Sequence, residues 1–112
     1  MCTYPPSIYG LIGKMISRSG QREALLALLL RGTENMPGCL SYVIAKDAQD
    51  EDAVWITEVW EDEASHHDSL QLSSVRDTIA QAMPLIADFE PGVVTDPVGG
   101  VGLPPVRTDE SL

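Results

Sequence analysis

Two neighbouring segments, CLSYVIAK (Cys39–Lys46) and AVWITEVW (Ala53–Trp60), decide the fold, because the side chains of each divide into two alternating sets. Alternation is typical of β-strands, whose successive side chains point to opposite faces of a sheet. The second segment divides into Val54, Ile56, Glu58 and Trp60 on one face and Trp55, Thr57 and Val59 on the other. The acidic loop at residues 47–52 joins the two segments, which predicts an antiparallel hairpin.

The residues before this hairpin predict two further elements. The apolar, partly β-branched stretch Tyr9–Ile16 indicates a strand. Gln21–Arg31 indicates a helix, because its leucines recur at helical spacing. Gly32 follows at the position where a left-handed C-terminal cap is expected.

The residues after the hairpin predict one helical region and a last strand. The helical region is expected over Glu61–Leu70 and to continue over Ser74–Met83, and the side chain of Asp62 is expected to cap its start. Glu90–Asp96 is predicted as an edge strand that the prolines at positions 91 and 97 bound, because proline is tolerated in sheets mainly at edges.

The predicted order is therefore strand, helix, strand, strand, helix, strand. This is the ferredoxin-like βαββαβ order, an α+β fold in which helices cover one face of a four-stranded antiparallel sheet. Residues 1–97 are expected to form this one domain, beginning with an extended leader at 1–7, and residues 98–112 a Gly/Pro-rich C-terminal tail. Apolar side chains such as Trp55 on the uncovered face predict a second copy of the sheet, and hence a homodimer.

The charge balance narrows the range of partners. Asp and Glu total 17 against 7 Lys and Arg, a net charge of −10 over 112 residues. A surface this acidic repels phosphate backbones and anionic lipid, so neither nucleic acid nor a membrane is expected as a partner. The longest apolar run, Ala24–Leu30, is too short to span a bilayer. Cys2 and Cys39 form no C-x-x-C pair, which favours a reduced, cytoplasmic protein.

Four motifs together resemble the antibiotic biosynthesis monooxygenase family, namely YGLIGKM (Tyr9–Met15), MPGCLSY (Met36–Tyr42), WITEVW (Trp55–Trp60) and Val75-Arg76. The resemblance covers about residues 9–89. It implies a dimeric α/β barrel that oxidises a quinol, an anthrone or a related aromatic compound. Molecular oxygen would be the co-substrate, and the resemblance implies no metal, flavin or other cofactor.

The resemblance also suggests individual site positions. Trp60 matches the tryptophan that ends the third strand and lines the pocket of family members. His66 falls where the anthrone-oxidising members have a pocket tyrosine, whereas their pocket asparagine is replaced by Ile56, so their mechanism does not transfer unchanged. Gly13 stands in place of the first-strand asparagine of haem-degrading relatives, which argues against haem degradation.

Oxygenation without a cofactor needs a base, a flat apolar slot and the exclusion of water. His66 is the candidate catalytic base, because an unperturbed histidine titrates near neutral pH. Glu58 is the second catalytic candidate, either as a base with a pKa raised by burial or as the group that orients His66. The candidates for substrate binding are a hydrogen-bond donor, an aromatic wall and two apolar neighbours, namely Tyr42, Trp60, Ile44 and Ile56.

Simpler interpretations of the same residues stay open. The pocket tryptophan is equally typical of a protein core, since it supplies so much packing area. Glu58 could form a structural ion pair with Lys14, with Arg76 or with a partner chain. Only one of His66 and His67 can face inward, because neighbours on a helix diverge by about 100°.

Two function classes therefore remain. The first is a cofactor-independent monooxygenase, and the second is a non-catalytic or differently catalytic dimeric barrel that binds a small aromatic or stress-related metabolite. A metal site is not expected, because the paired histidines have no further ligands at suitable spacing and loop 47–52 lacks the calcium-loop pattern. Cys39 is expected to be a buried, inert thiol.

Overall fold

The hairpin lies at one side of a four-stranded antiparallel sheet in the computed structural model, which describes residues 8–103. Strand β2 (Cys39–Lys46) pairs with β3 (Ala53–Trp60), and β3 pairs with β1 (Tyr9–Ser17). The other edge is β4 (Ile86–Thr95), so the strand order is β2-β3-β1-β4. The predicted ferredoxin-like α+β fold is confirmed. The expected leader and the end of the expected tail, residues 1–7 and 104–112, lie outside the described residues.

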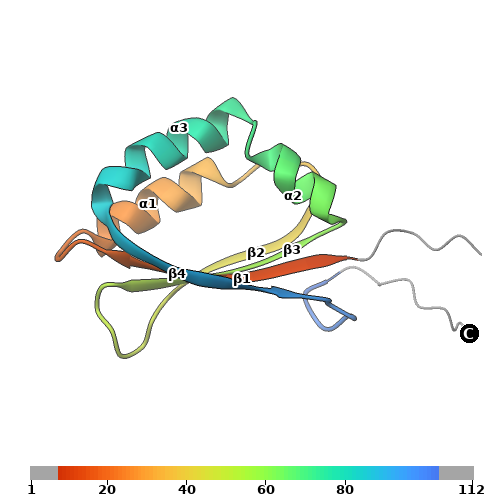
Figure 1. The fold of residues 1–112 in the computed structure, drawn as a ribbon, viewed down its shortest axis with the longest axis horizontal. Coiled ribbons are helices and arrows are strands. Elements are labelled where there is room, and N and C mark those ends of the chain that lie inside the picture. Colours follow the sequence, from red (N-terminus) through yellow and green to blue (C-terminus); the bar gives the residue numbers. More distant parts are fainter. Residues whose placement is uncertain (1–7, 104–112) are drawn as a thin grey trace, which may run out of the picture.

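The helices α1 (Arg22–Gly32), α2 (Glu63–Ser69) and α3 (Ser73–Ala82) all lie on one face of this sheet (Figure 1). A short 3₁₀ helix, η1 (Met83–Leu85), connects α3 to β4. Asp62 caps α2 as predicted, since its carboxylate accepts the Ser65 backbone N–H at 2.7 Å. The helix-covered face therefore holds the interior of the described chain.

The hydrophobic core lies between α1 and the first half of β3. Leu25, Leu26 and Leu29 of α1 are buried against Val54 and Ile56 of β3. The leucine spacing in the sequence thus predicted the buried stripe of the helix. Each of these side chains contributes about 1.5–3 kcal/mol through burial, so this end of the sheet is the stable base of the fold.

Gly32 ends α1, but the prediction that it forms a left-handed cap is wrong. Its φ angle is not positive, and it is the last residue of the helix. A Cβ atom at this position would collide with the hydroxyl of Thr78 and lie 2.6 Å from Thr78 Cβ. Gly32 is therefore suited to the close approach of α1 and α3.

The last strand begins four residues earlier than predicted, at Ile86, and Pro91 lies inside it rather than at its start. The register explains why the strand tolerates this proline. Ile12 pairs with Val93 whereas Lys14 pairs with Glu90, so the ladder is irregular where Pro91 lies. A proline has no backbone N–H to donate. Because β4 is an edge strand, Pro91 can affect only the pairing of β4 with β1 and not the pairing of the other strands.

The acidic hairpin loop is organised by hydrogen bonds to its own backbone. Asp47 Oδ1 accepts the backbone N–H groups of Gln49 and Asp50 at 2.8 and 2.9 Å. Arg22 of α1 donates to the carbonyl oxygens of Asp50 and Ala53 at 2.9 and 3.3 Å. Asp50 Oδ1 likewise accepts the Asp52 backbone N–H at 2.9 Å, so two of the loop carboxylates stabilise the turn of the hairpin.

The helix-free face of the sheet exposes large apolar side chains. Val43, Trp55 and Val93 are 54%, 37% and 57% exposed. Lys14 lies among them, with Nζ 5.2 Å from the centre of the Trp55 ring and 3.5 Å from a carboxylate oxygen of Glu90. None of the helices within residues 8–103 is long and apolar enough to cross a membrane.

Candidate functional site

A polar cluster forms where α2 crosses the end of β3. The alternation of β3 turns Glu58 and Trp60 to the helix-covered face, and α2 carries His66 over them. His66 Nε2 lies 3.8 Å from Glu58 Oε1, and the Trp60 indole N–H donates to the same oxygen at 2.9 Å. One carboxylate oxygen thus faces two ring nitrogens. This cluster unites the two predicted catalytic residues with the predicted aromatic wall.

Two aromatic rings enclose the imidazole of His66. Its centre lies 5.5 Å from the Trp60 ring in an edge-on arrangement and 5.3 Å from the Tyr9 ring in a tilted one. Trp60 is only 1% exposed, and the His66 side chain is 20% exposed. The cluster is therefore largely shielded from water, with His66 as its partly accessible member.

Tyr9 is a member of the cluster that the sequence reasoning missed. It pairs with Trp60 across β1 and β3, and paired residues share one face of a sheet. The signal was present in the sequence, because Tyr9 begins its strand and Trp60 ends its own. Antiparallel pairing of the two strands places these residues at the same end of the sheet. Without the register, the first strand could not be aligned with the third.

Burial sets the electrostatics of the cluster. It raises the pKa of Glu58, although the Trp60 hydrogen bond and the nearby His66 oppose this effect. Tyr42 is the cross-strand neighbour of Glu58, and burial followed by the Glu58 charge raises the pKa of its phenol. Tyr42 therefore keeps its proton at neutral pH and can act as a hydrogen-bond donor.

Cys39 lies beside the cluster at the start of β2, where it pairs with Trp60. Burial, and to a smaller degree Glu58, raises the pKa of the thiol, and Sγ donates to the Ser41 carbonyl at 3.5 Å. A neutral thiol is a poor nucleophile. Cys39 is half-buried rather than buried as predicted, and its inertness as a thiol stays a prediction that the raised pKa favours.

The other predicted residues have different surroundings. His67 is exposed, so His66 is the histidine that faces inward. Glu58 faces His66, whereas Lys14 pairs with Glu90. Ile44 and Ile56, a cross-strand pair, extend from the cluster into the core, where Ile56 is 5% exposed. Their role as substrate contacts stays a prediction.

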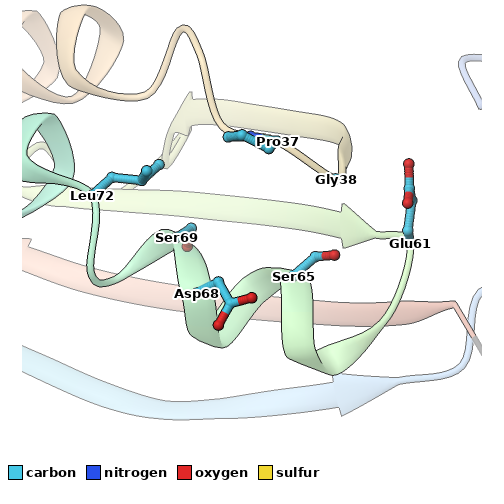
Figure 2. Close-up of a pocket in the computed structure, with 7 residues that line it drawn as sticks. All are labelled: Pro37, Gly38, Glu61, Ser65, Asp68, Ser69 and Leu72. Atoms are coloured by element: carbon cyan, nitrogen blue, oxygen red, sulfur yellow. The ribbon is translucent and has the colours of Figure 1, made fainter.

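A separate cavity of about 270 Å³ lies on another side of α2 (Figure 2). It is lined by Pro37, Gly38, Glu61, Ser65, Asp68, Ser69 and Leu72. No predicted site residue lines it, but Ser69 Oγ donates to the His66 carbonyl at 2.6 Å. The cavity and the cluster thus share α2 as a common wall.

The side chains of residues 8–103 include no group of three or more His, Cys, Asp or Glu that could hold a metal ion. The cluster itself combines one imidazole, one carboxylate, the two phenols of Tyr9 and Tyr42 and an indole. These groups can accept and return a proton and can bind a flat aromatic molecule through its faces and oxygens. Its chemistry is thus acid–base chemistry next to an aromatic surface.

The chain matches the family model described as antibiotic biosynthesis monooxygenase over residues 8–81. A solved structure from Chloroflexus aurantiacus, named for the same family, is 56% identical, with a TM-score of 0.85 over 88% of this chain and 100% of that one. A Nitrosomonas europaea structure, also named for the family, is 14% identical, with a TM-score of 0.77 over 87% and 96% of the two chains. A Pseudomonas aeruginosa protein is 18% identical, with a TM-score of 0.75 over 87% and 100%. These two show the fold alone.

No curated protein shows significant similarity to the chain. The family match spans more than half of the residues and includes β1, β2, β3 and α2, which carry the cluster. The Chloroflexus aurantiacus structure extends the likeness over most of the chain at high identity. The protein therefore belongs to the antibiotic biosynthesis monooxygenase family.

Proposed function

We propose that the protein is a cofactor-independent monooxygenase that oxidises a quinol, an anthrone or a related electron-rich aromatic compound with molecular oxygen. The observation that carries this proposal is the pairing of His66 Nε2 with Glu58 Oε1 at 3.8 Å beside two aromatic rings. The pairing supplies a proton acceptor next to a surface for a flat substrate. Membership of the family supports the same reaction class.

For an anthrone, the chemistry balances without an added reductant. The base removes a proton from the ring CH₂ group, and the resulting anion passes one electron to O₂. The two radicals combine into a C–O–O bond, and the protonated base returns its proton to form a hydroperoxide. Loss of water then leaves a carbonyl group. One oxygen atom enters the substrate, the other leaves as water, and the substrate supplies all four electrons.

The cluster residues divide this work. His66 takes and returns the proton. Tyr42, whose pKa is raised by burial and by Glu58, donates a hydrogen bond to a substrate oxygen. Tyr9, which is half-buried, forms the wall that faces the aromatic substrate, and the buried Trp60 forms the aromatic wall behind His66. Because these walls exclude water, they also protect the substrate anion from the solvent.

The second candidate function is a dimeric barrel that binds a small aromatic or stress-related metabolite without oxidising it. Ile56 favours this candidate, because the position that carries a polar amide in the anthrone-oxidising branch is here an apolar residue buried at 5% exposure. A site with fewer polar contacts to the substrate is better suited to binding than to guiding an anionic intermediate.

We further propose that the protein is a homodimer formed through the helix-free sheet face. Val43, Trp55 and Val93 expose an apolar surface there, and a two-fold copy would present the same surface in return. The charges of Lys14 and Glu90, which lie on this face, would be buried in the dimer as a pair, so neither would be left without an opposite charge.

The free thiol of Cys39 supports a location in the reducing cytoplasm.

Oxygen uptake by the purified full-length protein tests the function. It is measured against a panel of hydroquinones and anthrones, with autoxidation subtracted and Trp60→Phe as the variant that alters the aromatic wall. We expect saturable uptake and, with ¹⁸O₂, one labelled oxygen atom in the product. Uptake no faster than autoxidation across the panel would overturn the proposal, and a titration of the same compounds by tryptophan fluorescence would then test the binding function.

A further inference from the structure

We infer that Glu58 is a positioning residue that holds the His66 imidazole with its proton on Nε2, so that Nδ1 is the atom that accepts the substrate proton. This inference rests on the proposed function for the role of the base. The orientation of the ring itself depends only on the geometry of the cluster.

The carboxylate of Glu58 favours one tautomer. The indole nitrogen of Trp60 has a proton and no lone pair to offer, so it donates to Glu58 Oε1 at 2.9 Å. An ionised carboxylate has acceptor oxygens only. His66 Nε2 therefore faces an acceptor oxygen 3.8 Å away. A neutral imidazole meets an acceptor favourably only with the N–H form of that nitrogen.

The charged and titratable neighbours reinforce this arrangement. From β2, Tyr42 and Cys39 face Glu58, and both groups have raised pKa values and stay neutral. From β1, Tyr9 lies against the His66 ring. Neither of the lysines in the ion pairs of residues 8–103 is paired with Glu58. Glu58 is thus the acidic side chain that His66 Nε2 faces, at 3.8 Å.

The remaining nitrogen of His66 is available for the reaction. Nε2 is the ring nitrogen that approaches a carboxylate, at 3.8 Å, whereas no hydrogen bond or ion pair within the described part of the chain engages Nδ1. The side chain is 20% exposed. A general base needs a free lone pair within reach of the substrate proton. Nδ1 meets this requirement only while Nε2 keeps the proton. Glu58 thus contributes by orienting the base rather than by taking the proton itself.

Long-range ¹H–¹⁵N correlation spectra of the full-length protein test the tautomer without any substrate. The measurement is made at a pH at which both histidines are neutral, and His67→Gln assigns the two signal sets. The exposed His67 is the internal reference for an unconstrained ring. We expect a smaller share of the Nδ1–H form at His66 than at His67. Equal shares at the two histidines, or a larger share at His66, would overturn the inference.

Three variants separate positioning from a merely structural role. Glu58→Gln keeps an acceptor oxygen at the same place, so the Nε2–H form should persist. Glu58→Leu removes the acceptor, so the His66 tautomers should shift toward those of His67. Asp68→Asn changes an exposed carboxylate on the helix of His66 and should change nothing. A tautomer share that stays unchanged in folded Glu58→Leu would contradict the inference.

Kinetics link the tautomer to the reaction. In oxygen-uptake assays, Glu58→Gln should retain most of kcat, whereas Glu58→Leu should lose at least about tenfold in kcat with a smaller change in KM. A protein with the expected tautomer but no uptake would refute the proposed function alone. Uptake with equal kcat in both variants would refute the positioning role alone.

Discussion

Replacing His66 with glutamine, His66→Gln, removes the proposed base while it keeps a polar side chain of similar length beside Glu58. The amide can still donate to Glu58 Oε1, which His66 Nε2 faces at 3.8 Å, but it cannot accept a proton at neutral pH. Loss of a general base costs about 10²- to 10⁴-fold in rate. We therefore expect kcat to fall by this factor, which corresponds to about 2.7–5.4 kcal/mol in the activation free energy.

The structural cost of the same change is smaller. The imidazole contacts the rings of Tyr9 and Trp60, and such ring pairs contribute about 0.5–1.5 kcal/mol each. The variant should lose about 1–3 kcal/mol in the free energy of unfolding, or roughly 4–13 °C in Tm at about 4 °C per kcal/mol for a domain of this size. A typical domain with 5–15 kcal/mol of stability stays folded after such a loss. Unfolding thus cannot account for the expected loss of turnover.

The assay compares His66→Gln with His67→Gln, the matched change at the exposed neighbouring histidine. Oxygen uptake is followed at 25 °C on the best substrate of the panel, and thermal unfolding is followed on the same samples by circular dichroism. His67→Gln should resemble the wild type in both measurements. A kcat for His66→Gln within about threefold of the wild type would show that the base is elsewhere, and Glu58 would be the next candidate.

Three further changes test the electrostatics, the packing and the assembly. Because burial raises the pKa of Glu58, the folded state binds this proton more tightly than the unfolded state, and stability should fall as pH rises from the unfolded pKa through the folded one. Urea denaturation at pH 4 and pH 7 should show a smaller decrease for Glu58→Gln than for the wild type, and an equal decrease would contradict the raised pKa. Gly32→Ala should destabilise by about 1–3 kcal/mol because its Cβ collides with Thr78, whereas Gly13→Ala, with no atom within 4 Å, should be nearly neutral in thermal unfolding. Trp55→Asp on the helix-free face should convert the dimer to a monomer in light scattering, and a wild type of single-chain mass would refute the proposed dimer.

Most of the fold could be predicted from local patterns, and the two errors have a common cause. The alternation of β2 and β3 and the leucine spacing of α1 reflect which face of each element is buried. With the apolar, partly β-branched stretch of β1, these patterns located the elements nearly to the residue. Pro91 and Gly32 were interpreted through local rules for strand and helix ends. Their actual roles depend on an irregular ladder at a sheet edge and on contact with Thr78, which are properties of the assembled sheet and helices.

The candidate site shows the same division. Alternation predicted that Glu58, Trp60 and Ile56 share one face of β3, and they do. Alternation cannot tell which helix covers which part of that face. Ile56 lies in the core with the leucines of α1, whereas Glu58 lies under α2 next to His66. The inward orientation of His66 came only from the family resemblance, because two adjacent histidines on a helix carry no periodic signal.

The two ends of the helix-covered face differ in a way that packing alone does not explain. Under α1, the residues of β3 that join the core are apolar, and Val54 and Ile56 are almost completely buried. Two residues further along the same face, the chain buries a carboxylate whose pKa rises as a result, which is unfavourable for stability at neutral pH. A leucine at position 58 would extend the core at no such cost. Proteins retain such exceptions to the rules of packing mainly at functional sites, and Glu58 contacts the one histidine of the chain that is turned inward. The buried carboxylate is thus the feature of this domain that a purely structural role explains least, and its partner His66 is the residue through which it would act.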